Sequence, residues 1–122
     1  MAHLGFDLEA AGWRWNVSPF LVASIAGAES SFGANRCGYN VFGWNSCNGD
    51  SFDSFNDAIN TVTRGLRVNY INRWHLRTVE AIGRTYCGTP NPATGFCMFW
   101  VPNVAWYMRH RFGASLSVEY PR

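Results

Sequence analysis

Residues 19–33 decide the fold of this chain, and they read Pro-Phe-Leu-Val-Ala-Ser-Ile-Ala-Gly-Ala-Glu-Ser-Ser-Phe-Gly. The run holds a single charge in an otherwise uncharged, apolar sequence, and its pattern predicts a helix packed on the core. Ser18 is a favoured N-cap residue, and Pro19 suits the first helical position. Gly33 is typical of a helix stop.

The single charge is Glu29, near the end of this predicted helix. Helical spacing puts Glu29 on the flank that carries Val22, Ile25 and Phe32, at the edge of the core-facing stripe. Burial penalises a carboxylate and the negative end of the helix dipole lies close by, so we expect a raised pKa for Glu29. A carboxylic acid that keeps its proton near neutral pH can act as a general acid. The alternative is a surface charge paired with an arginine.

The composition indicates one domain over residues 1–122, because 122 residues that are 48% hydrophobic can form a core. Six tryptophans are more than a small core readily hides, so we expect some rings to line a surface groove. Flat aromatic faces suit the C–H groups of sugar rings. The candidates are Trp13, Trp15, Trp44, Trp74, Trp100 and Trp106.

The net charge of +2 is too small to indicate a nucleic-acid partner. All ten basic residues are arginine. This fits an anionic polymer such as a cell wall, and genome composition explains it equally well. No metal or other cofactor is expected, because His3, His75 and His110 are scattered and the cysteines lack zinc-ligand spacing.

The four cysteines form two pairs of identical spacing, Cys37 with Cys47 and Cys87 with Cys97. Each pair spans Gly-, Asn- or Pro-rich sequence, so we expect two local disulfides and an oxidising compartment. The start of the chain lacks the pattern of a signal peptide, and no segment is long and apolar enough for a membrane span. We expect an exported or phage-delivered domain, or a module of a longer protein.

The periodicity predicts a mainly α-helical, two-lobed domain. Residues 34–52 lose the helical period, and we expect there a small irregular or β-hairpin lobe beside a cleft that Glu29 faces. The tail after Gly113 is expected to be pinned or frayed. The other helices are expected over residues 4–15, from about 54 through 70, over about 76–86, and from 100 or 102 through 112.

Several segments carry a family pattern. Residues 26–33 read Ala-Gly-Ala-Glu-Ser-Ser-Phe-Gly, and residues 40–44, beginning eleven residues after Glu29, read Asn-Val-Phe-Gly-Trp. The first resembles the catalytic helix end of lysozyme-like peptidoglycan hydrolases, and the second resembles an Asn-Leu-Phe-Gly-Ile block of their endo-β-N-acetylglucosaminidase branch, found in autolysins and phage lysins. Other segments resemble the same branch and follow one another in the same order, so that the resemblance covers the chain from Leu8 to Phe112. The Gly-Leu-Met-Gln of lytic transglycosylases is absent, while Trp44 and both cysteine pairs depart from the usual pattern.

The resemblance implies a hydrolase of β-1,4 bonds in peptidoglycan, with Glu29 as the catalytic acid. It implies a second carboxylate in the small lobe, for which Asp50 is preferred. It also implies a functional Tyr86 whose hydroxyl hydrogen-bonds the substrate acetamido group; the alternative for Tyr86 is an aromatic residue at a helix end that packs on the core. Asn40, Phe42, Trp44 and Asp53 are the expected substrate contacts. Asp53 also suits a helix cap, and Asp57 suits a first-turn partner of the helix dipole.

Alternatives remain open at this point. The acetamido group itself can attack the anomeric carbon, so one enzyme carboxylate can suffice. A muramidase or lytic transglycosylase would use the same acid. A wall-binding module without activity, or a disulfide-stapled structural or toxin-like domain, would not use it. The expected protein is a monomer in the extracellular space or cell wall that binds glycan strands, without nucleic acid or membrane insertion.

Overall fold

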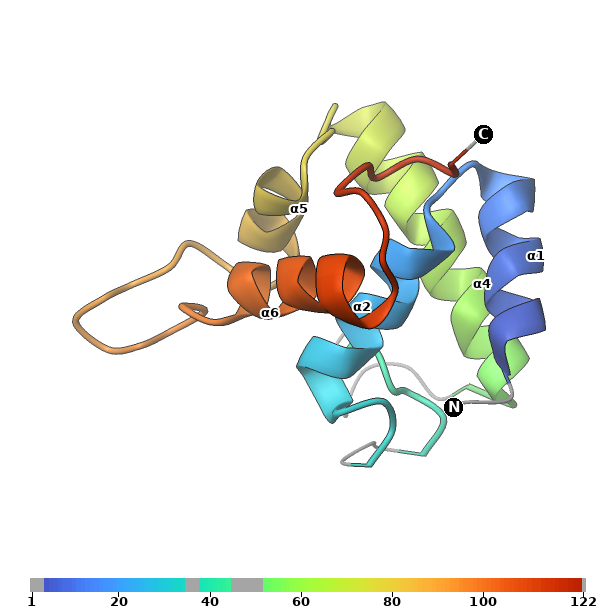
Figure 1. Cartoon of the computed structure of the whole chain (residues 1–122), viewed down its shortest axis with the longest axis horizontal. Coiled ribbons are helices and arrows are strands. Elements are labelled where there is room, and N and C mark those ends of the chain that lie inside the picture. The colour runs from blue at the N-terminus through green and yellow to red at the C-terminus, as the bar shows by residue number, and fades with distance from the viewer. Residues whose placement is uncertain (1–3, 35–37, 45–51, 122) are drawn as a thin grey trace.

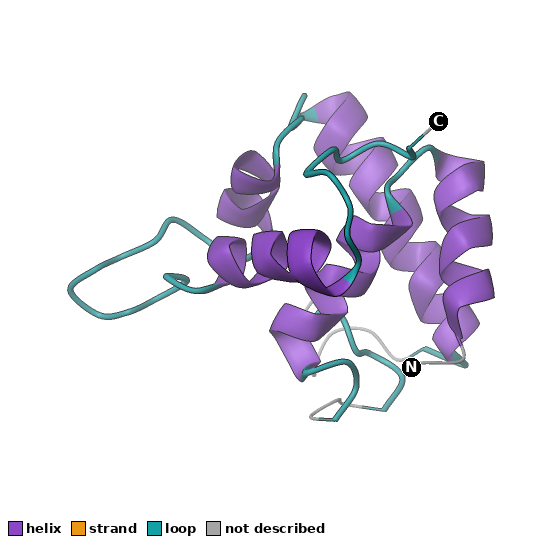
Figure 2. Ribbon diagram, in the orientation of Figure 1, coloured by secondary structure: helices purple, strands orange, loops and turns teal. Residues whose placement is uncertain are grey.

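The computed structural model describes residues 4–34, 38–44 and 52–121. These residues are mainly helical and contain no strand, so the described part of the expected small lobe, 38–44, is irregular. Figure 1 shows the arrangement of the helices, and Figure 2 shows how loops connect them. No helix in the described residues has the length and apolar character needed to cross a membrane.

Helix α2, Pro19–Ser30, occupies the centre of the molecule. Ser18 caps it as expected, because its Oγ accepts a hydrogen bond of 3.2 Å from the Leu21 amide. Nine of its twelve residues are buried, which matches its mostly apolar sequence with Glu29 as the single charge. Gly27 permits close packing, since a Cβ there would lie 2.6 Å from the Phe32 ring and 2.9 Å from the Tyr107 ring.

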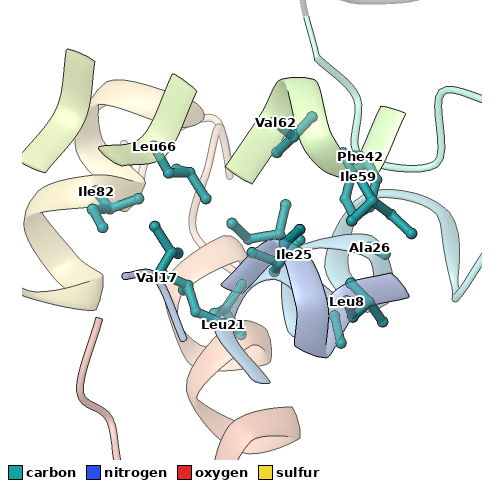
Figure 3. Close-up of a cluster of buried hydrophobic side chains, with 14 of the residues drawn as sticks. Leu8, Val17, Leu21, Ile25, Ala26, Phe42, Ile59, Val62, Leu66 and Ile82 are labelled. Atoms are coloured by element: carbon teal, nitrogen blue, oxygen red, sulfur yellow. The ribbon is translucent and has the colours of Figure 1, made fainter. Parts of the chain in front are cut away.

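Helices α1, Gly5–Trp15, and α4, Phe55–Gly65, lie side by side and cover one flank of α2 (Figure 1). Figure 3 shows side chains from these elements pointing toward one another. The fully buried residues include Val17, Leu21, Ile25, Ile59, Val62, Leu66 and Ile82. The inner face of α4 and of the segment that follows it is fully buried at its centre, while Phe55 and Tyr70 at its two ends are partly buried.

Helix α4 continues into η2, Leu66–Arg73, which has the wider turn of a π-helix. The Trp74 amide accordingly donates to the Asn69 carbonyl, five residues back, at 3.0 Å. Helix α5, Val79–Tyr86, follows. It begins three residues later than predicted, because Thr78 is the N-cap and its Oγ1 accepts from the Ala81 amide.

The predicted disulfide between Cys87 and Cys97 is confirmed, with an S–S distance of 2.07 Å. It closes the base of a loop that extends away from the helices (Figure 1). Cys37 and Cys47 lie outside the described residues, so their bridge stays a prediction.

The last helix is α6, Trp100–Trp106, which continues into η3, Tyr107–Arg111. The chain beyond it is pinned, not frayed. The Ser18 amide donates to the carbonyl of buried Val118 at 2.9 Å. Glu119 accepts a 2.7 Å hydrogen bond from the Asn16 side chain and pairs with Arg67 at 3.0 Å. The tail thus fastens to the turn between α1 and α2.

Candidate active site

The end of α2 positions the candidate acid. The helix ends at Ser30 rather than running to Gly33, because Ser31 and Phe32 already adopt the left-handed region with φ of 52° and 59°. Gly33 continues this turn with φ of 95°. The Phe32 ring packs edge-on against Tyr107 at 4.9 Å between centroids. This contact holds the turn, so Glu29 lies in the last turn of a fixed helix.

Ser30 ties this helix end to the segment 38–44. Its Oγ lies 2.6 Å from the Val41 carbonyl and 3.0 Å from the Ala26 carbonyl, both within donating distance. The same oxygen accepts from the Gly33 amide at 3.0 Å. Because Ser30 is buried, these bonds are sheltered from water and fix the segment against Glu29.

Asn40 closes the segment on itself. Its side chain accepts from the Trp44 amide at 3.0 Å and donates to the Trp44 carbonyl at 2.8 Å. Asn40 is only 6% exposed, and Phe42 is fully buried in the core. The expectation that Phe42 contacts substrate is therefore wrong for its ring, because core packing encloses that ring. Asn40 instead shapes the turn that presents Gly43 and Trp44.

The carboxyl of Glu29 is held by two residues distant in sequence. The indole Nε1 of Trp100 donates to its Oε1 at 2.8 Å. Its Oε2 lies over Gly43, where a Cβ would come within 2.3 Å of that oxygen. Gly43 also has φ of 63°, so both conformation and space require glycine there. The Glu29 side chain otherwise remains open to solvent, as a group that must reach a ligand does.

The surroundings of Glu29 favour its protonated form. Partial burial of the carboxyl raises its pKa, and the Trp100 hydrogen bond, which favours the carboxylate, offsets only part of that rise. The predicted direction is confirmed, with desolvation as the principal cause. Burial also raises the pKa of Tyr86 well above its ordinary value, and the nearby Glu29 and Tyr70 add to this rise. Tyr86 thus stays neutral beside the acid.

Tyr86 has a clear structural partner. Its hydroxyl donates to the Phe42 carbonyl at 2.5 Å, so its proton is already engaged within the protein. Its ring lies between Trp44 and Trp100, at 5.8 Å and 5.3 Å between centroids. Tyr86 therefore links the turn of 38–44 to α6, beside the Glu29 carboxyl.

A hollow of about 660 Å³ has Gly43 in its wall, and the Glu29 carboxyl lies against Gly43 without itself lining the hollow. We call it the aromatic pocket. Within it, Tyr70 packs at 5.3 Å from the ring of Trp74, which is 47% exposed. Its lining consists of Gly43, Trp44, Asn69, Tyr70, Trp74, Thr85 and Tyr86. A wall of partly exposed rings with a few amide and hydroxyl groups can stack against sugar rings and bond their substituents.

The structure brings together Glu29, Trp44 and Tyr86 among the predicted site residues. Asp53 is exposed at the start of α4, and its amide donates to the Asp57 carboxylate at 3.2 Å. The cap of α4 is Ser54, not Asp53, because the Ser54 Oγ accepts from the Asp57 amide at 3.0 Å. Asp57 lies in the first turn, as expected. Asp50 lies outside the described residues, and no described carboxylate lines the aromatic pocket.

Sequence reasoning missed the roles of Trp100 and Tyr70. Trp100 was only one of six candidate tryptophans, and no local pattern pairs it with a carboxylate 71 positions away. Tyr70 packs partly buried against the core and also lines the aromatic pocket, and no local sequence pattern signals this second role. Of the six tryptophans, only Trp100 is buried.

Comparison of the chain with protein-family models, with curated proteins and with solved structures gives no match. Across the described ranges, no group of three or more His, Cys, Asp or Glu side chains is placed to hold a metal ion.

Proposed function

We propose that this protein hydrolyses β-1,4 glycosidic bonds of bacterial peptidoglycan, with Glu29 as general acid, on a lysozyme-like fold. The observation that carries the proposal is the placement of Glu29. Its pKa is raised, its side chain is open to solvent, and its carboxyl lies against Gly43 at the edge of the aromatic pocket. The sequence resemblance independently selects the same residue.

In the proposed reaction, a glycan strand lies in the aromatic pocket with the bond to be cleaved beside Glu29. Trp100 holds Oε1, so the proton on the carboxyl is available at Oε2 for the leaving oxygen. Cleavage leaves positive charge at the anomeric carbon, which the substrate acetamido oxygen or a carboxylate such as Asp50 then stabilises. Water then attacks the anomeric carbon and gives up a proton to the Glu29 carboxylate, which completes the hydrolysis and restores the acid. After proton donation the Trp100 N–H stabilises the carboxylate, since this hydrogen bond favours the charged form.

The aromatic pocket supports a carbohydrate substrate. Trp74 exposes almost half of its surface, and Tyr70 supports it from within the pocket. Asn69 and Thr85 supply polar groups in the same wall. An N-acetylglucosaminidase specificity is proposed from the resemblance. Action outside the cell or in the wall follows from the substrate and agrees with the Cys87–Cys97 disulfide.

The test compares wild-type protein with Glu29→Gln on purified cell walls. The amide matches the carboxyl in shape but cannot donate this proton, so activity should fall about a hundredfold or more. Glu80→Gln is the matched control, because Glu80 is exposed in the first turn of α5 and does not line the aromatic pocket. Mass spectrometry of the fragments identifies the bond from its glucosamine, muramic or anhydro ends.

The same experiment separates the proposal from its alternatives. Anhydro ends identify a lytic transglycosylase, and muramic reducing ends identify a muramidase. A folded wild-type protein that binds walls without releasing fragments is a binding module. Wild-type activity in Glu29→Gln would remove the proposed mechanism.

A further inference from the structure

A second hollow, of about 460 Å³, lies between α1 and α4. We call it the arginine pocket. Its lining includes Arg14, Trp15, Asn60 and Arg64, together with Trp44 and Asn69, which also line the aromatic pocket. Because Trp44 and Asn69 belong to both walls, an extended ligand can pass from one pocket to the other across them.

The two arginines have no carboxylate partner among the described residues. Within the described residues, the ion pairs are those of Arg67 and Arg77 with Glu119, and neither Arg14 nor Arg64 pairs with a carboxylate. Both side chains are exposed. The guanidinium of Arg64 lies over the Trp15 ring at 5.8 Å, a cation–π contact that restricts where its fork points.

The chemistry of this pocket suits a carboxylate. Two guanidinium groups can each offer paired N–H donors in the planar geometry that a carboxylate accepts. The amides of Asn60 and Asn69 add polar groups able to bond a peptide backbone. The aromatic faces of Trp15 and Trp44 suit the apolar part of the same ligand.

We propose that the arginine pocket binds the free carboxylates of the peptide substituents carried by the glycan, while the aromatic pocket binds the sugars. This inference rests on the proposed function and adds to it a preference for peptide-bearing over bare strands. Trp44 and Asn69, shared by both pockets, would lie where the peptide leaves the sugar chain.

The test measures binding by calorimetry to the Glu29→Gln protein, which prevents turnover. Three probes are compared: a peptide-free wall glycan fragment, the same fragment with stem peptides whose carboxylates are free, and that fragment with those carboxylates amidated. We expect the fragment whose stem peptides have free carboxylates to bind about tenfold more tightly than either of the other two probes. Adding Arg14→Gln and Arg64→Gln should abolish this difference and leave the peptide-free affinity unchanged. Arg109→Gln, exposed on η3 and outside both pockets, is the control.

The outcomes separate the two proposals. Binding of all three probes with equal affinity, or a preference that survives both arginine substitutions, overturns the arginine-pocket proposal and leaves the proposed function standing. Failure to bind any probe overturns both. Salt gives a second measurement that needs no arginine substitution, because only affinity for the free carboxylates should fall steeply as ionic strength rises. An equal salt response for all probes contradicts the proposal.

Discussion

The indole N–H of Trp100 donates to Oε1 of Glu29 at 2.8 Å across 71 residues of chain. This bond opposes the effect of burial on the carboxyl, since a donor stabilises the charged form. Trp100 therefore limits how far the pKa of Glu29 rises. It also fixes the carboxyl against α6.

Substitution Trp100→Phe tests this relationship. Removing the donor should raise the pKa of Glu29 further, and a general acid is active only while protonated. The basic limb of the pH profile of kcat/KM should therefore move to higher pH. Trp106→Phe, on the same helix but 55% exposed, is the control. An unmoved basic limb in a folded Trp100→Phe protein would mean that this bond does not tune the acid.

Substitution Glu29→Gln tests the raised pKa through stability. A folded-state pKa above the ordinary value of 4.5 means that the unfolded chain loses this proton first as pH rises. Above about pH 4.5 the unfolded chain is therefore stabilised by ionising Glu29, and the free energy of unfolding falls. Below that pH the carboxyl is protonated in both states and does not change the free energy of unfolding. We expect Glu29→Gln to melt at a higher temperature than wild type at neutral pH.

The gap in melting temperature between Glu29→Gln and wild type should close in acid, below the ordinary pKa. Glu80→Gln should instead melt at a lower temperature than wild type at neutral pH. The Glu80 carboxylate lies in the first turn of α5, where it interacts favourably with the positive end of the helix dipole. A wild-type protein more stable than Glu29→Gln at neutral pH would contradict the raised pKa.

Alanine substitutions at Gly43 and Gly38 distinguish the effect of a steric clash with Glu29 from the effect of backbone strain. Gly43 and Gly38 have similar φ, 63° and 57°, so alanine at either should cost about 1–2 kcal/mol of strain. Only at Gly43 would the new Cβ meet the Glu29 carboxyl, since nothing lies within 4 Å of a Cβ at Gly38. We expect Gly43→Ala to lose at least as much stability as Gly38→Ala, and only Gly43→Ala to lose at least tenfold in activity. Equal activities would show that Gly43 does not position the acid.

The position of Glu29 near the end of an apolar helix capped by Ser18 was predictable from local sequence. The rise in its pKa was predicted in direction from the burial expected of that helix flank, and burial is its principal cause in the structure. The two groups that hold the carboxyl were not predictable, because Gly43 and Trp100 reach it only through tertiary packing. The prediction that the Phe42 ring contacts substrate was wrong, because a sequence motif does not say whether a residue contributes its ring or its carbonyl. In this structure the ring is core and the carbonyl binds Tyr86.

Substitution Tyr86→Phe tests the role of that hydroxyl. It leaves the Phe42 carbonyl without its donor, which should cost about 1–3 kcal/mol in the free energy of unfolding. Tyr39→Phe, at a residue 43% exposed, is the control and should change little. We expect the KM of Tyr86→Phe to stay near the wild-type value when the variant and the wild type are each assayed well below their melting temperatures. Lost turnover with unchanged stability would instead place the Tyr86 hydroxyl in the reaction.

The two tryptophans of the aromatic pocket should separate sugar binding from folding. The Trp74 ring is 47% exposed, so Trp74→Ala should weaken glycan binding by about 1–2 kcal/mol, about 5- to 30-fold, with little change in melting temperature. The Trp44 ring packs so closely on Gly65 that a Cβ there would lie 2.6 Å from it, and it also contacts Tyr70.

Trp44→Ala should therefore lower both affinity and stability, the latter by about 2–4 kcal/mol, since it removes core packing as well as a stacking face. Calorimetry with a peptide-free glycan fragment and thermal unfolding of the two variants give both quantities. Because the Trp44 ring braces the pocket wall against α4, its loss should also loosen Tyr70, and the double variant should lose less affinity than the sum of the two single changes. Strict additivity, or unchanged binding in a folded Trp74→Ala protein, would show that these rings do not form one sugar-binding surface.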